Sequence, residues 1–301
     1  MESKLSLQRW IDEAARQSMS FGDYCLKAQA EELEIPAGAI LDRMEKALEV
    51  MAEAVKHGLE GKRSRSGLAG GAGSKMQALM EVKPDGFILG RTMSRAVMTA
   101  LAASESNACM GRIVAAPTAG SSGVLPGVLF SVGDLYCFDR RHLTKGLVVA
   151  GCIGRVIASR ASLSGAEGGC QAECGSAAAM AAGATVEICG GTPGQVGDAA
   201  AIALKNMLGL VCDPVAGLVE VPCVKRNAGA AAQALVAAEM ALCGISSAIP
   251  VDEVIDAMAS IGHSIPQTLK ETALGGLATT PTGLRIAGNN SRSYHSCPKK
   301  E

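Results

Sequence analysis

The chain has 301 residues, of which 48% are hydrophobic and 19% charged, and its formal net charge is -1. A chain of this length can bury a substantial core as one large domain or two smaller ones, and the composition is typical of a globular protein. The near-neutral charge and the aromatic fraction of 3% argue against nucleic acid as a partner, because they indicate neither a basic surface nor base-stacking rings.

The N-terminal segment MESKLSLQRW carries charged residues where a secretory signal needs an apolar run. No run of about 18 uncharged apolar residues occurs anywhere in the chain. We therefore expect a cytoplasmic protein without a membrane-spanning segment. Its eleven cysteines are then kept reduced, so stable disulfides are not expected.

The first 60 residues are predicted to be helical. Segment 6–17 has one apolar face, and apolar residues recur at spacings of three and four over residues 41–55. Two loops follow, with a helical pattern at 90–111 between them. Residues 61–75 are basic and glycine-rich, and residues 115–127 (AAPTAGSSGVLPG) are small.

From residue 128 onward, helical segments alternate with short Gly, Pro and Ser interruptions. The predicted helices cover residues 139–162, 176–188, 192–210, 228–244 and 250–262. Thr192 and Pro250 mark helix starts. Because alternating β-branched residues are scarce, we predict an all-α fold, with α/β as the alternative in which GRIVAAPT and GLVEVPC are short strands. We expect one domain over residues 1–285, with the helical segment 1–60 packed on it, and a polar, mobile tail at 286–301.

The cysteines fall into two groups by context. Five lie within or at the edge of helical segments, where a buried thiol behaves as a small apolar residue: Cys25, Cys109, Cys137, Cys152 and Cys243. Six lie beside glycine or proline, where the backbone can approach a metal-bound thiolate: Cys170, Cys174, Cys189, Cys212, Cys223 and Cys297. No zinc-ribbon pair or ferredoxin run occurs, so the spacing alone leaves both inert thiols and metal ligands open.

Four segments together resemble the α subunits of bacterial iron-sulfur-dependent L-serine dehydratases: APTAGSSGVLPG, SGAEGGCQAECGSA, ALKNMLGLVCDPVAGLVEVPCVKRNA and ETALGGLATTPTG. The resemblance covers residues 5–285. It implies an L-serine ammonia-lyase that releases pyruvate and ammonia, with a [4Fe-4S] cluster held by Cys170, Cys212 and Cys223. Cys174 is interpreted as a structural or supporting thiol, although its spacing of four places it on the helix face of Cys170.

Three cysteines for four irons leave one iron open in this family. An open iron acts as a Lewis acid on the substrate hydroxyl, whereas a fully ligated cluster mainly transfers electrons. The small-residue loop is then a candidate site for the substrate carboxylate, with Thr118, Ser121 and Ser122 as donors, against the alternative of an ordinary helix connection. Lys75 is a further candidate partner of the carboxylate, against the alternative of a solvated lysine.

The general base stays unassigned. No histidine is convincingly placed for this role among the four in the chain, His57, His142, His263 and His295. The resemblance implies that a β subunit supplies a catalytic histidine, so we expect an obligate hetero-oligomer. Some single-chain relatives end in a cysteine that reaches the open iron. Position alone makes Cys297 a candidate for that role, against a disordered tail.

Three other functions stay open from the sequence. The first is a lyase that removes sulfide from L-cysteine, and the second is an iron-sulfur sensor or electron-transfer module. The third is a metal-free helical interaction protein. Serine disposal into pyruvate would fit amino-acid catabolism or gluconeogenesis.

Overall fold

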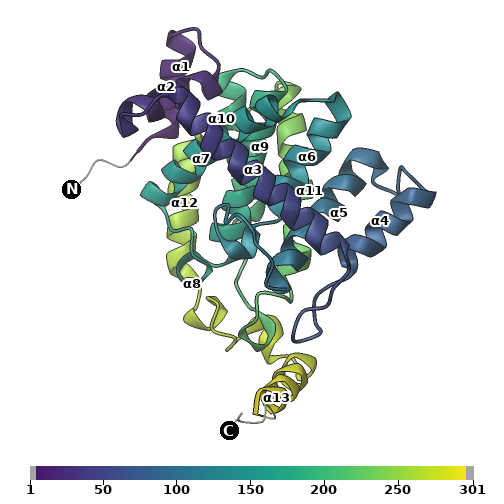
Figure 1. Ribbon diagram of the computed structural model, residues 1–301. Coiled ribbons are helices and arrows are strands. Elements are labelled where there is room, and N and C mark those ends of the chain that lie inside the picture. The colour runs from purple at the N-terminus through teal and green to yellow at the C-terminus, as the bar shows by residue number, and fades with distance from the viewer. Residues whose placement is uncertain (1–4, 296–301) are drawn as a thin grey trace.

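The computed structural model describes residues 5–295, with side chains up to residue 290. Its described part is almost entirely helical (Figure 1), which confirms the predicted all-α class. Within residues 5–295 the only β pairing is an isolated bridge between Cys212 and Lys270. The strands of the α/β alternative therefore do not form.

The α-helices are α1 (Leu7–Arg16), α2 (Phe21–Leu33), α3 (Ala37–Leu59), α4 (Ala72–Val82), α5 (Gly90–Ala108), α6 (Val124–Tyr136), α7 (Arg140–Arg160), α8 (Gly165–Gly168), α9 (Ser176–Ile188), α10 (Pro193–Met207), α11 (Cys223–Leu242), α12 (Val251–Ser264) and α13 (Pro281–His295). Short 3₁₀ segments are η1 (Ala119–Ser121), η3 (Val215–Gly217), η4 (Gln267–Leu269) and η5 (Gly276–Thr279), and η2 (Gln171–Gly175) is a π-helical segment.

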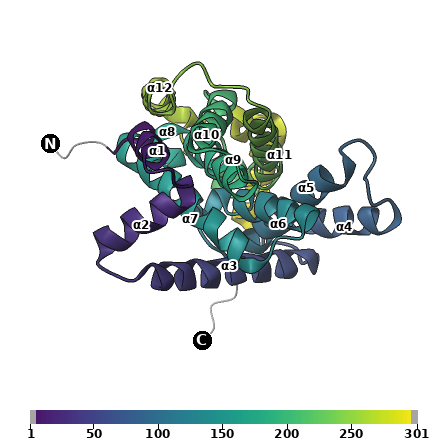
Figure 2. The same cartoon turned by 90° about the horizontal axis from the view of Figure 1, so that it is seen from above.

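Helix α9 forms the centre of the bundle. Each of its residues, from Ser176 to Ile188, is buried, and α6, α7, α10 and α11 pack around it (Figure 2). A helix that is apolar on all sides has to be surrounded by other elements. Its alanines and glycine let the neighbours approach closely, since a Cβ added at Gly183 would lie 2.3 Å from Cδ1 of Ile153.

The N-terminal helices pack on the outside of this bundle. Helix α3 contacts α5 and α7, and a Cβ added at Gly58 would lie only 1.8 Å from the carbonyl oxygen of Ala102. The start of α1 is joined to α12, because Asp252 accepts hydrogen bonds from Oγ of Ser6 at 2.6 Å and from N of Leu7 at 2.9 Å. Residues 5–60 thus pack on the remaining fold.

The helix starts predicted from capping residues agree with the structure, whereas the two predicted loops are shorter than expected. Thr192 forms a capping box at the start of α10, and Pro250 directly precedes α12. However, α4 and α6 begin inside the two segments predicted as loops. Their glycines serve helix packing as well as turns: a Cβ added at Gly127 would lie 2.9 Å from Cβ of Ala100.

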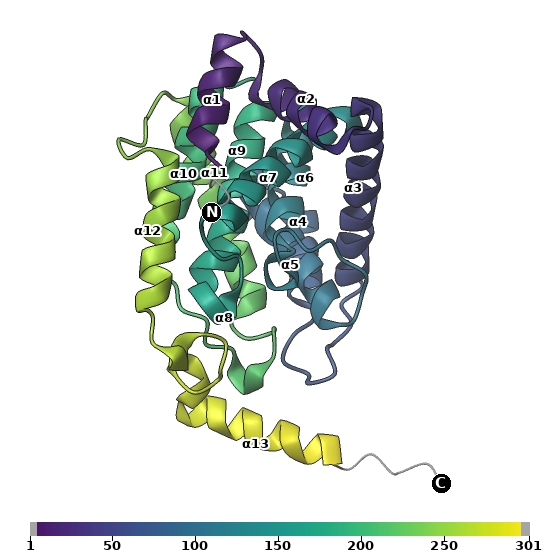
Figure 3. The ribbon, with the colours of Figure 1, turned by 90° about the vertical axis from the view of Figure 1, so that its left-hand side faces the viewer.

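Helix α13 lies across one end of the bundle (Figure 3), where it packs against η3 and η5. Residues 286–295 of the predicted tail therefore belong to a helix, and Cys297 lies outside the described residues. Over the described range, every helix is too short or too polar to cross a membrane.

Candidate active site

Three helices of the bundle begin at the same end, close to the predicted site residues. The loop at 117–123 leads into α6. Cys170 begins a helical run that continues through η2 into α9, and Cys223 is the first residue of α11. Helix N-termini stabilise anionic groups such as thiolates. The fold therefore brings two of the predicted ligands and the predicted carboxylate loop to one end of the bundle.

The third predicted ligand, Cys212, faces the same region from the segment between α10 and α11. Burial raises the pKa of its thiol, and the neighbouring Glu173, Cys170 and Cys223 raise it further. Burial, Cys170 and Glu173 likewise raise the pKa of Cys223 to about 12. Thiols that disfavour each other's charge suit binding to a shared cation, which takes up that charge and releases their protons.

Among the described side chains, those of residues 5–290, no group of three Cys, His, Asp or Glu could hold a single metal ion. This result does not conflict with a four-iron cluster. The thiolates of such a cluster bind different irons and so lie further apart than the ligands of a single ion. Sulfur donors and glycine backbone are the chemistry that iron-sulfur clusters require. The residues present therefore fit the implied group.

Arg226 fastens the Cys212 segment beside Cys170. Its Nη1 donates to the carbonyl oxygen of Val211 at 2.8 Å, and its Nη2 donates to Oδ1 of Asp213 at 2.8 Å. The pKa of Cys170 is lowered by a hydrogen bond from the thiol of Cys174 and by the charge of Arg226, against the effect of burial. Cys174 thus lies beside Cys170, as the spacing predicted.

Two glycines allow the backbone to approach this region. Gly169 has φ of +76°, and an added Cβ would lie 2.9 Å from the carbonyl oxygen of Leu210. A Cβ added at Gly165 would lie 3.1 Å from Sγ of Cys212 and 2.6 Å from Oε2 of Glu173. Side chains at these positions would occupy the space beside the thiols.

Asn227 joins the carboxylate loop to the helix that begins with Cys223. It is completely buried. Its Nδ2 donates to the carbonyl oxygens of Gly120 at 2.7 Å and Cys223 at 3.0 Å, and its Oδ1 accepts from N of Gly123 at 2.9 Å. Asn227 was not among the residues predicted from the sequence; the available signal was an amide one helical turn after a candidate ligand, in an alanine-rich helix.

The three loop hydroxyls have different surroundings. Oγ1 of Thr118 donates to Oε1 of Glu173 at 2.8 Å and lies 3.1 Å from Oγ of Ser121. Oγ of Ser122 is buried and has no hydrogen-bond partner within the described chain. Lys75 is exposed in the first turn of α4, and no hydrogen bond or ion pair joins it to this loop in the described structure. The fold thus brings the three hydroxyls together, without Lys75.

Two buried carboxylates that the sequence analysis missed hold the glycine-rich loop. Glu105 accepts hydrogen bonds from the backbone N–H groups of residues 70, 72 and 73 at 2.8–3.1 Å. Glu220 accepts from Oγ of Ser64 at 2.6 Å and from Oγ of Ser66 at 2.7 Å. Glu220 lies three residues before Cys223, so the loop is fixed to the same end of the bundle.

None of the three histidines with described side chains contacts the site residues. Nδ1 of His57 lies 2.9 Å from Oγ of Ser106, and His142 stacks on Phe138. His263 is exposed in the last turn of α12. Of His295 only the backbone is described. The general base is therefore still unassigned within this chain.

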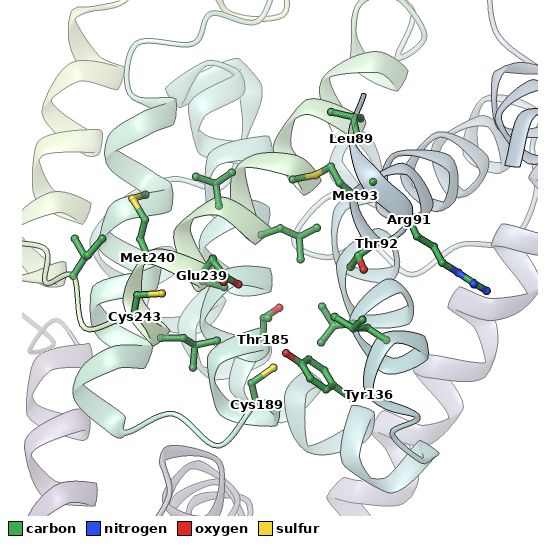
Figure 4. A pocket seen from close by; sticks show the side chains of 18 residues that line it. Leu89, Arg91, Thr92, Met93, Tyr136, Thr185, Cys189, Glu239, Met240 and Cys243 are labelled. Carbon is green, nitrogen blue, oxygen red and sulfur yellow. The ribbon is translucent and has the colours of Figure 1, made fainter. Parts of the chain in front are cut away.

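A separate cavity of about 580 Å³ lies at the opposite ends of α6, α9 and α11 (Figure 4). Its lining is mainly apolar and includes Tyr136, Thr185, Cys189, Glu239 and Cys243. None of the predicted site residues lines this cavity.

Comparison with known families gives a decisive match. The sequence model described as the serine dehydratase alpha chain matches residues 13–278. The chain belongs to the serine dehydratase alpha-chain family. This membership confirms the resemblance found in the sequence.

Curated relatives of this serine dehydratase alpha-chain member agree. The "Probable L-serine dehydratase, alpha chain" of Bacillus subtilis is 50% identical over 281 residues, covering 93% of each chain. The "L-serine dehydratase, alpha chain" of Peptoniphilus asaccharolyticus is 51% identical over 199 residues, covering 66% of this chain and 68% of the relative. The "L-serine dehydratase" of Mycobacterium tuberculosis is 49% identical over 186 residues, covering 60% of this chain and 40% of that longer relative.

Proposed function

We propose that this chain is the α subunit of a [4Fe-4S]-dependent L-serine ammonia-lyase that converts L-serine to pyruvate and ammonia. The observation that carries the proposal is the convergence of Cys170, Cys212 and Cys223 beside the loop at 117–123. The names of the relatives support serine as the substrate. Thiolate ligands need a reducing compartment, which supports a cytoplasmic location.

The three thiols would hold the cluster by three of its irons. When bound, the cluster supplies an open iron that polarises the substrate hydroxyl as a Lewis acid. Arg226 holds the backbone at Val211 and Asp213 beside Cys170, and glycine keeps the space next to Cys212 clear. These residues would hold the proposed ligands in position around the cluster.

The loop that Asn227 fixes is proposed to orient the substrate carboxylate. Oγ of Ser122 is the hydroxyl without another partner in the described chain, so it is the first candidate donor. Thr118 already donates to Glu173, so its role is to position the loop unless the substrate displaces that hydrogen bond. Lys75 makes no hydrogen bond or ion pair with the loop in the described structure, so it is the weaker candidate for the same carboxylate.

Removal of the α-proton requires a base held within hydrogen-bond reach. We propose that a β subunit supplies it, because none of the histidines of known side-chain placement contacts the loop or the thiols. Loss of water then gives an enamine, which tautomerises to an imine and is hydrolysed to pyruvate and ammonia. The "alpha chain" in the names of the relatives supports a second chain type.

The test is turnover by the complex purified without oxygen. The chain is co-expressed with its β subunit, and pyruvate release is followed with L-serine and with L-cysteine. Turnover of L-serine with higher kcat/KM than L-cysteine is expected. Preferred turnover of L-cysteine would replace serine as the substrate, and turnover of neither by the iron-loaded complex would favour a sensor or electron-transfer role.

A further inference from the structure

Glu173 lies at the centre of the candidate site, between the carboxylate loop and the cysteine ligands. Its Oε1 accepts the hydrogen bond from Thr118 at 2.8 Å. Its Oε2 points toward the Gly165 backbone, where a Cβ would lie 2.6 Å from Oε2 and 3.1 Å from Sγ of Cys212. The side chain therefore connects three segments that the sequence places far apart.

The π-helical segment η2 sets this position. Cys170 directly precedes η2, and Glu173 and Cys174 lie within it. A single π turn inside a helix shifts the side chains that follow, and such turns occur frequently at functional sites. Here Cys174 contacts Cys170 while Glu173 contacts the loop.

Glu173 differs from Asp213, Glu105 and Glu220 in lacking a partner for its charge. Asp213 is paired with Arg226. Glu105 accepts three backbone N–H groups, and Glu220 accepts two serine hydroxyls. For Glu173 the structure shows one hydrogen bond, from Thr118, and no ion pair in residues 5–290.

The surroundings of Glu173 would favour a cation. The Glu173 side chain is partly buried, and the negative charge of Glu271 lies nearby. A buried carboxylate is stabilised when a cation comes within hydrogen-bond distance. An amino-acid substrate brings such a cation, because its α-amino group is protonated at neutral pH.

We propose that the Glu173 carboxylate binds the α-ammonium group of the substrate and so selects amino acids over hydroxy acids. The inference rests on the proposed function, since it takes L-serine as the ligand of this site. The hydroxyl would face the cluster, the carboxylate would face Ser122, and the ammonium group would face Glu173. Each polar group of serine then has a partner of matching chemistry.

The test compares two substitutions that separate charge from hydrogen bonding. Glu173→Gln removes the charge but keeps an oxygen that can accept from Thr118, and Thr118→Val removes that hydrogen bond but keeps the charge. Glu173→Asp is the second charged variant, in case the glutamine variant folds poorly. Iron and sulfide contents and circular dichroism are measured for each α–β complex.

Two binding measurements are made on each complex: KM for L-serine, and the inhibition constant of 3-hydroxypropanoate, which is serine without its amino group. A hydrogen-bonded charge pair of this kind corresponds to a change on the order of 10- to 100-fold in affinity. We expect Glu173→Gln to raise KM for L-serine by that factor and to change the inhibition constant by less than about threefold. Thr118→Val should affect both ligands to a similar extent.

Three results would overturn the inference while leaving the proposed function intact. In the first, wild-type turns over serine and Glu173→Gln, with its cluster present, keeps the wild-type KM. In the second, both ligands weaken equally, which would make Glu173 a purely structural residue. In the third, Glu173→Gln abolishes a dependence on K⁺ without changing the preference for serine, so the carboxylate binds a metal cation. Failure of the proposed function is distinguished by wild-type itself, which would then bind and turn over no serine.

Discussion

The two ends of α9 and α11 carry the same residue type in opposite settings. Cys170 begins the helical run that contains α9, and Cys189 directly follows it. Cys223 begins α11, and Cys243 directly follows that helix. At the starting end, a hydrogen bond from Cys174 and the charge of Arg226 lower the pKa of Cys170, whereas burial and the neighbouring Cys170 and Glu173 raise that of Cys223.

The second end is an apolar packing region. Burial and the charge of Glu239 raise the pKa of Cys189 to about 11. Both Cys189 and Cys243 line the apolar cavity (Figure 4). The comparison teaches that the gathering of three thiols beside Arg226 and the loop at 117–123, against two thiols in the lining of an apolar cavity, separates candidate ligands from structural thiols. Composition alone does not separate them.

The largest expected effect comes from exchanging one thiol at each end. Cys212→Ser should lower serine turnover by at least about a thousandfold, because it removes one of the three proposed ligands of the cluster. Cys189→Ser is the matched control and should retain turnover within about threefold, since a partly buried thiol there acts as an apolar side chain. Pyruvate release by both complexes is the measurement. Equal loss in both variants would remove the distinction between the two ends.

The next effect concerns the amide that joins the loop to α11. Asn227→Leu leaves the Gly123 N–H and two carbonyl groups without this partner, so the free energy of unfolding should fall by about 3 kcal/mol. Asn107→Ala is the control, because Asn107 donates to the carbonyl oxygen of Ala119 at the surface. The free energy of unfolding of this variant should fall by less than about 1 kcal/mol. Denaturant unfolding measures both. Similar losses would show that Asn227 has no special role.

A smaller effect is expected for the thiol beside Cys170. Cys174→Ala removes a hydrogen bond to Cys170 but none of the three proposed ligands. Iron content should stay at the wild-type level, and turnover should fall by less than about tenfold. Iron analysis and pyruvate release are the two measurements. Loss of the cluster in this variant would add Cys174 to the ligand set.

The smallest effect is expected for an ion pair at the other end of α9. There Nζ of Lys145 lies 2.9 Å from Oδ1 of Asp23 and 3.4 Å from Oε1 of Glu187. Burial raises the pKa of Asp23, but hydrogen bonds from Lys145 and Ser20 outweigh it and leave this pKa below its usual value. The stability from Asp23 is therefore present above its unfolded pKa of 3.8 and is lost as pH falls through the lower folded value.

Asp23→Asn should accordingly lower the free energy of unfolding at pH 7 by up to about 1 kcal/mol, because the pair is partly exposed. The difference from wild-type should shrink below about pH 3.8, and serine turnover at pH 7 should be unchanged. Denaturant unfolding at several pH values checks the first expectation. A difference that grew on acidification would mean that the sign is wrong.

The sequence predicted the helical class and most helix positions because these depend on local patterns. Thr192 and Pro250 are examples, since capping and proline effects act within a few residues. The starts of α4 and α6 were misplaced because small residues that are typical of loops here allow close helix packing. Local patterns do not distinguish the two uses of glycine.

The missed site residues depend on contacts between distant segments. Thr118 and Glu173 are 55 positions apart, and Gly123 and Asn227 are 104 apart. Neither pair lies on one helix face or follows a known spacing, so periodicity could not indicate it. The proposed cysteine ligands were accessible only through the family resemblance, because Cys170, Cys212 and Cys223 follow none of the common metal-binding spacings.

The central claim is that the thiols at the starting ends of α9 and α11, together with Cys212, hold an iron-sulfur cluster. The most direct test is iron and acid-labile sulfide analysis of the complex purified without oxygen. We predict about four irons and about four sulfides per α chain, the composition of a [4Fe-4S] cluster. An active complex that contains neither iron nor sulfide would contradict the account.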